Sequence, residues 1–219
     1  MDKPTLIYCY DAYCGWCYGF GPVMKKISED YADKFAFEVL SGGMIIGDQV
    51  RPIHFIAGYI KNAYKRVEEL TGIKFGDDFL WHINNPEESD WHMNSEKSAI
   101  ALCVFKEIYP DRQIEFATDL QYALNYEGRD LDDDEAYRHL LEKYSIQPEA
   151  FYPKLKSEEY KEQAYHDFAV CKHLQVEGFP QVFIQLEETK FYLLAKGYTA
   201  YDDLRARIEN VLTENEKIT

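Results

Sequence analysis

The chain has few basic residues, no long apolar run and only five cysteines among its 219 residues. Its 24 lysines and arginines are outnumbered by 39 acidic residues, which gives a net charge of −15. A protein that binds the phosphate backbone of nucleic acid, or an anionic membrane surface, needs a basic stripe or patch. None occurs in the sequence, so we expect no nucleic-acid partner and no membrane partner.

The first residues also lack the features of an export signal. The opening stretch MDKPTLIYCYD contains neither the apolar core nor the small-residue cleavage site of a signal peptide. No run of eighteen apolar residues is present that could span a bilayer. If Met1 is the natural start, we expect the protein to stay in the reducing cytoplasm, where structural disulfides are rare.

Two of the five cysteines lie close together in the stretch YDAYCGWCYGFGP, residues 10–22. Five is too few, and the wrong parity, for a disulfide scaffold. Three uses of the pair stay open: half of a metal site, a structural disulfide, or a dithiol that performs redox chemistry. A zinc site needs a second pair of ligands, and the best available pair, Cys171 and His173, has a spacing that suits helix packing. The six histidines form no cluster at metal-ligand spacing, so we predict no metal and no cofactor.

The order of the predicted elements indicates an α/β fold. Residues 5–10 and 35–40 are β-branched and aromatic and predict strands, with a helix between them that begins at Cys14 and contains Pro22. Residues 181–186 and 191–197 predict an antiparallel hairpin, which an amphipathic helix follows. The strands therefore form β-α-β and β-β-α units at the two ends of the chain.

The middle of the chain has helical periodicity and little strand character. Its first helix carries an apolar stripe at helical spacing: Ile53, Ile56, Ile60, Tyr64, Val67 and Leu70. Residues 90–94 are expected to pack at a helix entry with Asn94 as the N-cap, the alternative being a segment that overhangs the active site. We therefore divide the chain into one half-domain at 1–46, a helical insertion at 47–176 and the second half-domain at 177–219.

A C-x-x-C motif that follows a strand and opens a helix is typical of a thioredoxin-like redox site. The later stretch VEGFPQVFI places Pro180 at the entry to the third strand, where thioredoxin-fold oxidoreductases carry a cis-proline. Together with the helical insertion, the two motifs resemble the DsbA-like group, and DAYCGWCYGFGP resembles its cytoplasmic FrnE-type members. The resemblance implies a thioredoxin fold with a large all-helical insertion, and a cis peptide bond between Phe179 and Pro180.

The resemblance also implies a thiol-disulfide oxidoreductase that reduces or isomerises disulfides in protein substrates, recycled by a cellular thiol reductant. Cys14 is the expected nucleophile, because the unpaired N–H groups of a helix N-terminus stabilise a thiolate. Cys17 is then the resolving thiol. The expected substrate-binding residues are Gly15, Trp16, Phe179 and Pro180. In a reducing compartment the dithiol rests reduced, so we expect a reductase or an isomerase and not an oxidant.

One position departs from the family pattern. Thioredoxin and DsbA carry a buried acid six residues before the first cysteine, and here that position is Tyr8, whose phenol is a poor proton shuttle at neutral pH. Asp11 is the nearest acid, and its charge opposes a thiolate at Cys14. Cys9, Cys103 and Cys171 are assigned to the core.

Two other functions stay open. The same fold hosts glutathione-dependent transferases and isomerases of the kappa type, which act on small molecules. Those enzymes usually keep a serine or a single thiol at the nucleophile position, whereas this chain retains both cysteines. A non-catalytic binding module that uses the aromatic-rich insertion is the third possibility.

Overall fold

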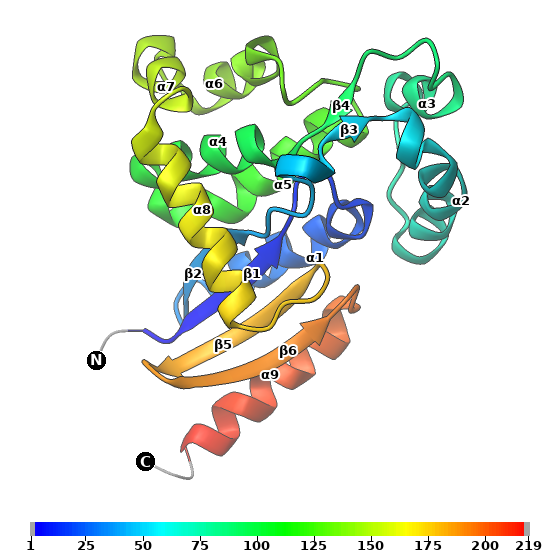
Figure 1. Ribbon diagram of the computed structural model, residues 1–219. Coiled ribbons are helices and arrows are strands. Elements are labelled where there is room, and N and C mark those ends of the chain that lie inside the picture. Colours follow the sequence, from blue (N-terminus) through cyan, green and yellow to red (C-terminus); the bar gives the residue numbers. More distant parts are fainter. Residues whose placement is uncertain (1–2, 217–219) are drawn as a thin grey trace.

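A computed structural model describes residues 3–216 and shows a four-stranded mixed sheet at its centre (Figure 1). The strands are β1 (Thr5–Tyr10), β2 (Ala36–Ser41), β5 (Gln181–Glu187) and β6 (Lys190–Lys196), in the order β2-β1-β5-β6. β1 runs parallel to β2 and antiparallel to β5, and β5 and β6 form an antiparallel hairpin. The α/β fold and the predicted strands are confirmed, with each strand boundary displaced by no more than one residue.

Alternation along β1 sends its side chains to two separate cores. Leu6, Tyr8 and Tyr10 belong to the main core, which helices α1 (Gly15–Asp30) and α9 (Tyr201–Glu216) help to cover. Ile7 and Cys9 belong to a smaller cluster on the other face, beneath α8 (Glu158–His173). In Figure 1, α8 crosses the front of the sheet. β1 is therefore the central strand, buried on both faces and paired on both edges.

The segment between β2 and β5 is largely helical, as predicted. Its helices are α2 (His54–Thr71), α3 (Asp77–Asn84), α4 (Ser95–Ile108), α5 (Gln113–Asn125), α6 (Arg138–Tyr144), α7 (Pro148–Leu155) and α8, with 3-10 turns η1 (Gly47–Gln49), η2 (Pro110–Arg112) and η3 (Asp134–Tyr137). It also contains a ribbon that periodicity did not indicate, because strands of two residues are too short to show a period: β3 (Arg51–Pro52) paired with β4 (His92–Met93). No helix among residues 3–216 is both long and apolar enough to cross a membrane.

Side chains of the insertion bond the outer strand β2 of the sheet. The Gln113 side chain accepts a hydrogen bond from the backbone N–H of Val39 at 2.9 Å and donates to the carbonyl of Phe37 at 3.2 Å. Lys106 of α4 bonds Glu38 of β2 at 2.7 Å and Asp167 of α8 at 3.0 Å. These contacts occupy the free edge of β2, which protects it from pairing with another chain. The division at 1–46, 47–176 and 177–219 stays a prediction.

Candidate functional site

Cys14 occupies the N-cap of α1, directly after the turn that leaves β1. Its backbone is extended (φ −86°, ψ 107°), and its Sγ accepts a hydrogen bond from the backbone N–H of Cys17 at 3.3 Å. The first turn of α1 contains no acidic side chain. The sulfur therefore faces the partial positive charge of the backbone N–H groups at the helix N-terminus. Cys14 keeps 7% of its surface exposed and Cys17 none, and both thiols are free. Cys14 is thus the sulfur that a second molecule can reach.

The structure brings the loop before β5 against this thiol. Cys14 Sγ donates to the carbonyl of Phe179 at 3.6 Å, across 165 residues of sequence. The peptide bond between Phe179 and Pro180 is cis, which confirms the prediction. The carbonyl of Pro180 accepts from Gly197 N at 2.8 Å, so the loop is held from the side of β6 as well. Gly15 and Trp16 follow Cys14 and are half-buried beside it.

Cys17 lies inside the protein, where its proton is hard to remove. Burial raises the pKa of the Cys17 thiol well above its usual value, and the neighbouring Cys14 raises it further. Burial also raises the pKa of Tyr8, the residue at the position of the family's acid, and Cys17 and Cys14 add to that shift. Within residues 3–216 the Tyr8 hydroxyl has no nitrogen or oxygen partner at hydrogen-bond distance, and the Cys17 thiol is its polar neighbour. Tyr8 is therefore a neutral phenol against the thiols and not a proton acceptor.

Asp11 is the buried acid of this site, and its carboxylate joins three separate segments. One oxygen accepts from Tyr13 N at 3.0 Å and from the Ser95 hydroxyl at 2.9 Å, and the other accepts from Met44 N at 2.7 Å. The backbone carbonyl of Asp11 accepts from Cys14 N at 3.1 Å. Burial raises the pKa of Asp11. The three hydrogen-bond donors lower it, but the effect of burial is larger. Asp11 thus fixes the turn that carries Cys14 to the loop after β2 and to the start of α4.

A cavity of about 300 Å³ opens beside Cys14 between the thioredoxin-like half and the insertion. The predicted stripe on α2 supplies part of its wall through Ile56, Ile60 and Tyr64, which are half-buried, while Leu70 is 45% exposed. Ile56, Ile60 and Tyr64 pack against the border of the main core, whereas Ile53 and Val67 of the same stripe are buried within it. The stripe therefore borders both the main core and the cavity.

Further lining residues come from segments that the sequence did not connect with the site. Met44, Phe75, Phe79 and Met93 all contribute side chains to the cavity. Met93 belongs to the 90–94 segment and is buried in the cavity wall. Asn94 is the N-cap of α4, as predicted, accepting from Glu96 N at 3.1 Å. The sequence showed these only as ordinary apolar residues, since their convergence depends on tertiary packing.

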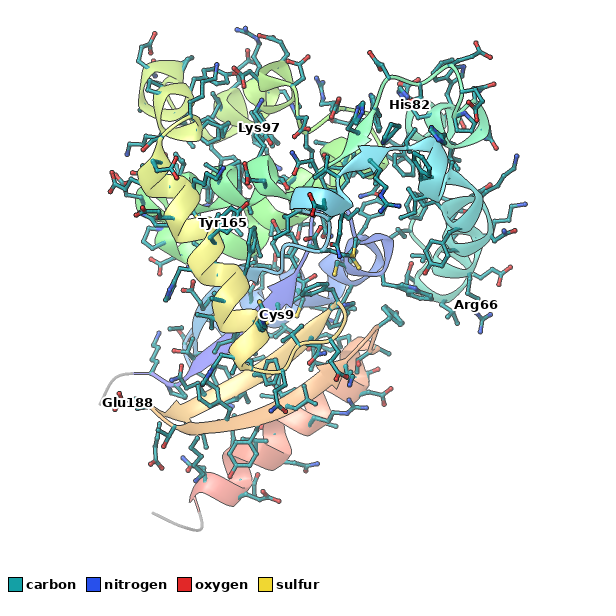
Figure 2. The ribbon with its side chains drawn as sticks, viewed as in Figure 1. Cys9, Arg66, His82, Lys97, Tyr165 and Glu188 are labelled. Atoms are coloured by element: carbon teal, nitrogen blue, oxygen red, sulfur yellow. The ribbon has the colours of Figure 1, made fainter. Side chains whose placement is uncertain are left out.

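The three remaining cysteines are buried, as predicted, and lie away from the dithiol. Cys9 and Cys171 belong to the small cluster under α8, where Figure 2 labels Cys9 beside the lower end of that helix. The Cys171 thiol donates to the carbonyl of Ser41 at 3.6 Å, which places it on the opposite face of the sheet from Cys17. Cys103 is 3% exposed in the main core. Within residues 3–216, no three His, Cys, Asp or Glu side chains are placed to hold a metal ion.

The ring of Phe179 occupies space that only a glycine at position 42 leaves free. A Cβ at Gly42 would lie 1.8 Å from Phe179 Cζ, so Gly42→Ala must displace the ring from the cavity wall. We expect Gly42→Ala to slow disulfide exchange by about ten- to a hundredfold, as small displacements near reacting groups do. Stopped-flow rates with a peptide disulfide would measure this. Gly58→Ala is the matched control, since a Cβ there meets no atom within 4 Å, and equal rates for both variants would contradict the role of Phe179.

Comparison with known proteins agrees with this arrangement. A family model described as a DSBA-like thioredoxin domain matches residues 5–209. A search of curated proteins gives no match.

Several solved structures share the fold over nearly their whole length. A "putative protein disulfide isomerase" from Nitrosomonas europaea superposes with a TM-score of 0.83 at 22% identity, covering 97% of this chain and 99% of that one. The cytosolic disulfide reductase DsbM from Pseudomonas aeruginosa superposes with a TM-score of 0.78 at 23% identity, covering 95% and 98%. A 2-hydroxychromene-2-carboxylate isomerase gives 0.66 at 15% identity, covering 98% and 99%. With the family match over most of its length, the chain belongs to the DSBA-like thioredoxin-domain family.

Proposed function

We propose that the protein reduces or isomerises disulfides in protein substrates, with Cys14 as the attacking thiol and Cys17 as the resolving thiol. The observation that carries the proposal is the position of Cys14 Sγ, which is 3.3 Å from the N–H of Cys17 and 3.6 Å from the carbonyl of Phe179. A backbone donor there supports a thiolate, and the Phe179 carbonyl marks where the backbone of a substrate can approach the same sulfur.

The exchange has two steps that balance in electrons and protons. The Cys14 thiolate attacks one substrate sulfur, which forms a mixed disulfide and releases the other substrate sulfur as a thiolate. Cys17 then loses its proton to the released thiolate or to water and attacks Cys14 Sγ. This breaks the mixed disulfide, frees the reduced substrate and leaves a Cys14–Cys17 disulfide. A cellular thiol reductant returns two electrons, and in isomerisation a second substrate thiol attacks the mixed disulfide in place of Cys17.

The direction of exchange follows from the compartment and from the site. The cytosolic reductase among the structural neighbours supports a cytoplasmic location, and the D-x-x-C-x-W-C pattern at Asp11–Cys17 supports a FrnE-type member. Strong oxidants of the DsbA kind have potentials near −120 mV because their reduced form is stabilised as a thiolate. Here Cys17 is held as a thiol by burial, and the acid Asp11 lies in the same turn. A reduced form without that stabilisation gives a more negative potential, so the dithiol acts as a reductant, and the reducing compartment keeps it reduced.

Two measurements test the proposed function together. We expect reduction of insulin by dithiothreitol to accelerate in the presence of the protein, and equilibration with glutathione buffers to give a potential more negative than about −180 mV, in the isomerase-to-thioredoxin range. A protein lacking both cysteines is the control for the insulin assay. A potential near −120 mV would show an oxidant, and no acceleration would rule out the dithiol mechanism.

The cavity beside Cys14 favours a second candidate, a glutathione-dependent transferase or isomerase of the kappa type that acts on a small molecule. A partly open cavity of about 300 Å³ is at the lower end of the size that small-ligand pockets span, roughly 300–1,000 Å³. The retained resolving thiol counts against this candidate. Formation of a glutathione conjugate or an isomerised product, unaffected by loss of Cys17, would establish it in place of disulfide exchange.

A further inference from the structure

A second pair of thiols lies on the face of the sheet opposite Cys17. Cys9 of β1 is fully buried and Cys171 of α8 is 2% exposed, and both belong to the small cluster beneath α8 (Figure 2). Both are free thiols, and the exchange mechanism uses neither of them. What this pair can do depends on how closely the two sulfurs approach each other.

Two kinds of contact place the Cys171 sulfur beside Cys9. The Cys171 thiol donates to the carbonyl of Ser41 at 3.6 Å. Ser41 ends β2 and directly follows Leu40, which is the partner of Cys9 in the parallel register of β1 and β2. The side chains of Cys9 and Cys171 also hydrogen-bond each other, as those of the active-site pair do. A disulfide between them therefore needs only a short approach, from contact to the S–S bond length of about 2.05 Å.

A depression in the surface leads from solvent to Cys171. It is lined by the last turns of α8 and the segment that follows, including Phe168, Lys172 and Gln175. Phe179 lines both this depression and the cavity beside the active-site thiol. Because Cys171 is almost fully buried at its base, only a very small molecule can reach the sulfur. Hydrogen peroxide is small and uncharged and meets this condition.

The pair is protected while α8 is closed. The hydrogen bond to Cys9 and burial raise the pKa of the Cys171 thiol. Asp167 raises that pKa further, whereas Lys106 lowers it. Because the thiolate is the reactive form, Cys171 reacts when the last turn of α8 opens locally. Closure then restores the contact with Cys9, and the backbone N–H of Val176 again bonds the Cys171 carbonyl at 3.0 Å.

We propose that Cys9 and Cys171 are a second redox pair, which hydrogen peroxide converts into a disulfide that cross-links β1 and α8. The Cys171 thiolate attacks one peroxide oxygen, which forms a sulfenic acid and releases hydroxide, and the hydroxide takes up the proton that Cys171 lost. The Cys9 sulfur then attacks the sulfenic sulfur, forms the S–S bond and releases water that carries the Cys9 proton. Two thiols and one peroxide thus become one disulfide and two waters.

The cross-link acts on the active site through the loop that follows α8. Cys14 lies five residues after Cys9, and Phe179, whose carbonyl contacts Cys14, lies eight residues after Cys171. A bond between positions 9 and 171 therefore holds together the two segments that carry the reacting thiol and its neighbouring carbonyl. In a reducing compartment such a bond forms only under oxidising stress and is reversed afterwards. The inference does not depend on disulfide exchange by Cys14.

Peroxide oxidation of the wild-type protein tests the inference directly. After prolonged treatment, acid quenching and unfolding in an alkylating agent, we expect one alkylated thiol among the five cysteines, that of Cys103, and a Cys9–Cys171 cross-link in the peptide map. The Cys14–Cys17 disulfide should form at least about tenfold faster, since it needs no opening of a helix. Three alkylated thiols, or Cys171 recovered as a sulfinic acid without a cross-link, would overturn the inference.

Variants separate this pair from the active site. In Cys14→Ser/Cys17→Ser the Cys9–Cys171 disulfide should still form, and its loss there would show that the active-site thiols relay the oxidation. In Cys9→Ala the sulfenic acid at Cys171 has no partner, so dimedone should label it, and absence of the label would contradict attack by Cys171. Cys103→Ala is the matched control, because it removes a buried cysteine outside the pair and should keep the cross-link.

Urea unfolding measures whether the bond secures α8. In the Cys14→Ser/Cys17→Ser protein we expect oxidation to raise the urea midpoint by about 1 M or more, because a cross-link between distant positions restricts the unfolded chain. Dithiothreitol should reverse the shift, and the same protein with Cys171→Ala should show none. An unchanged or lower midpoint in protein that carries the mapped cross-link would show that the bond does not hold α8 against β1.

Discussion

Replacing Cys14 by serine is expected to abolish disulfide exchange, whereas replacing Cys17 by serine should preserve the first step and accumulate mixed disulfides. A serine hydroxyl at position 14 offers no thiolate to attack a substrate sulfur, so the rate should fall to that of the uncatalysed reaction. In Cys17→Ser the Cys14 sulfur is intact, but nothing inside the protein can displace the bound substrate. The two variants should therefore fail at different steps.

Mass spectrometry of each variant after incubation with an oxidised peptide would show the difference. We expect a covalent adduct of one peptide on Cys17→Ser and none on Cys14→Ser. Cys103→Ala is the control, because Cys103 is buried in the main core away from the dithiol and its loss should leave exchange intact. Equal trapping by both serine variants would overturn the assignment of attacking and resolving thiols.

Asp11→Ala is expected to lower the free energy of unfolding by about 3–5 kcal/mol. The substitution removes the acceptor of three hydrogen bonds, from Tyr13 N, Met44 N and the Ser95 hydroxyl. A buried donor left without a partner costs about 1–3 kcal/mol, and release of the desolvated carboxylate offsets part of the sum. With a total stability of about 5–15 kcal/mol for a typical protein, a loss of this size is large.

Urea unfolding of the variants would measure the effect. Asp111→Ala is the matched control, since Asp111 is exposed on η2, and surface substitutions usually change stability by less than about 0.5 kcal/mol. Asp11→Asn should be intermediate, because the amide keeps one oxygen acceptor and loses the one that Met44 N requires. If Asp11→Ala unfolds at the same urea concentration as Asp111→Ala, then Asp11 does not hold the active-site turn.

The strands and the dithiol could be predicted because their signals are local. The β-branched and aromatic runs at 5–10 and 181–186 are short and distinct, and Cys14 follows the first of them directly. The apolar stripe of α2 did not reveal the cavity, for a physical reason. Periodicity shows that one face of a helix is apolar, but the same pattern serves a core and a cavity wall, and only the packing of other segments distinguishes them.

The part played by Asp11 could not be predicted for a related reason. Sequence reasoning placed this acid near Cys14 and saw only its charge. Its partners Met44 and Ser95 lie 33 and 84 residues further along the chain, and no local pattern connects them with it. From its charge alone, Asp11 was expected only to oppose a thiolate at Cys14. In the structure its carboxylate also holds the turn that carries Cys14.

The central position of β1 has a consequence for how the protein is made on the ribosome. β1 is translated well before its partner β5, which begins only at Gln181, so one edge of β1 stays unpaired while the whole insertion is synthesised. The Phe179 carbonyl that contacts Cys14 follows it by 165 residues, which takes roughly 8–33 s at 5–20 residues per second. During that interval the nascent chain carries an open dithiol and an open strand edge, both of which the last quarter of the chain covers. Early release of the nascent chain would therefore leave a fragment that is both reactive towards disulfides of other proteins and prone to aggregate.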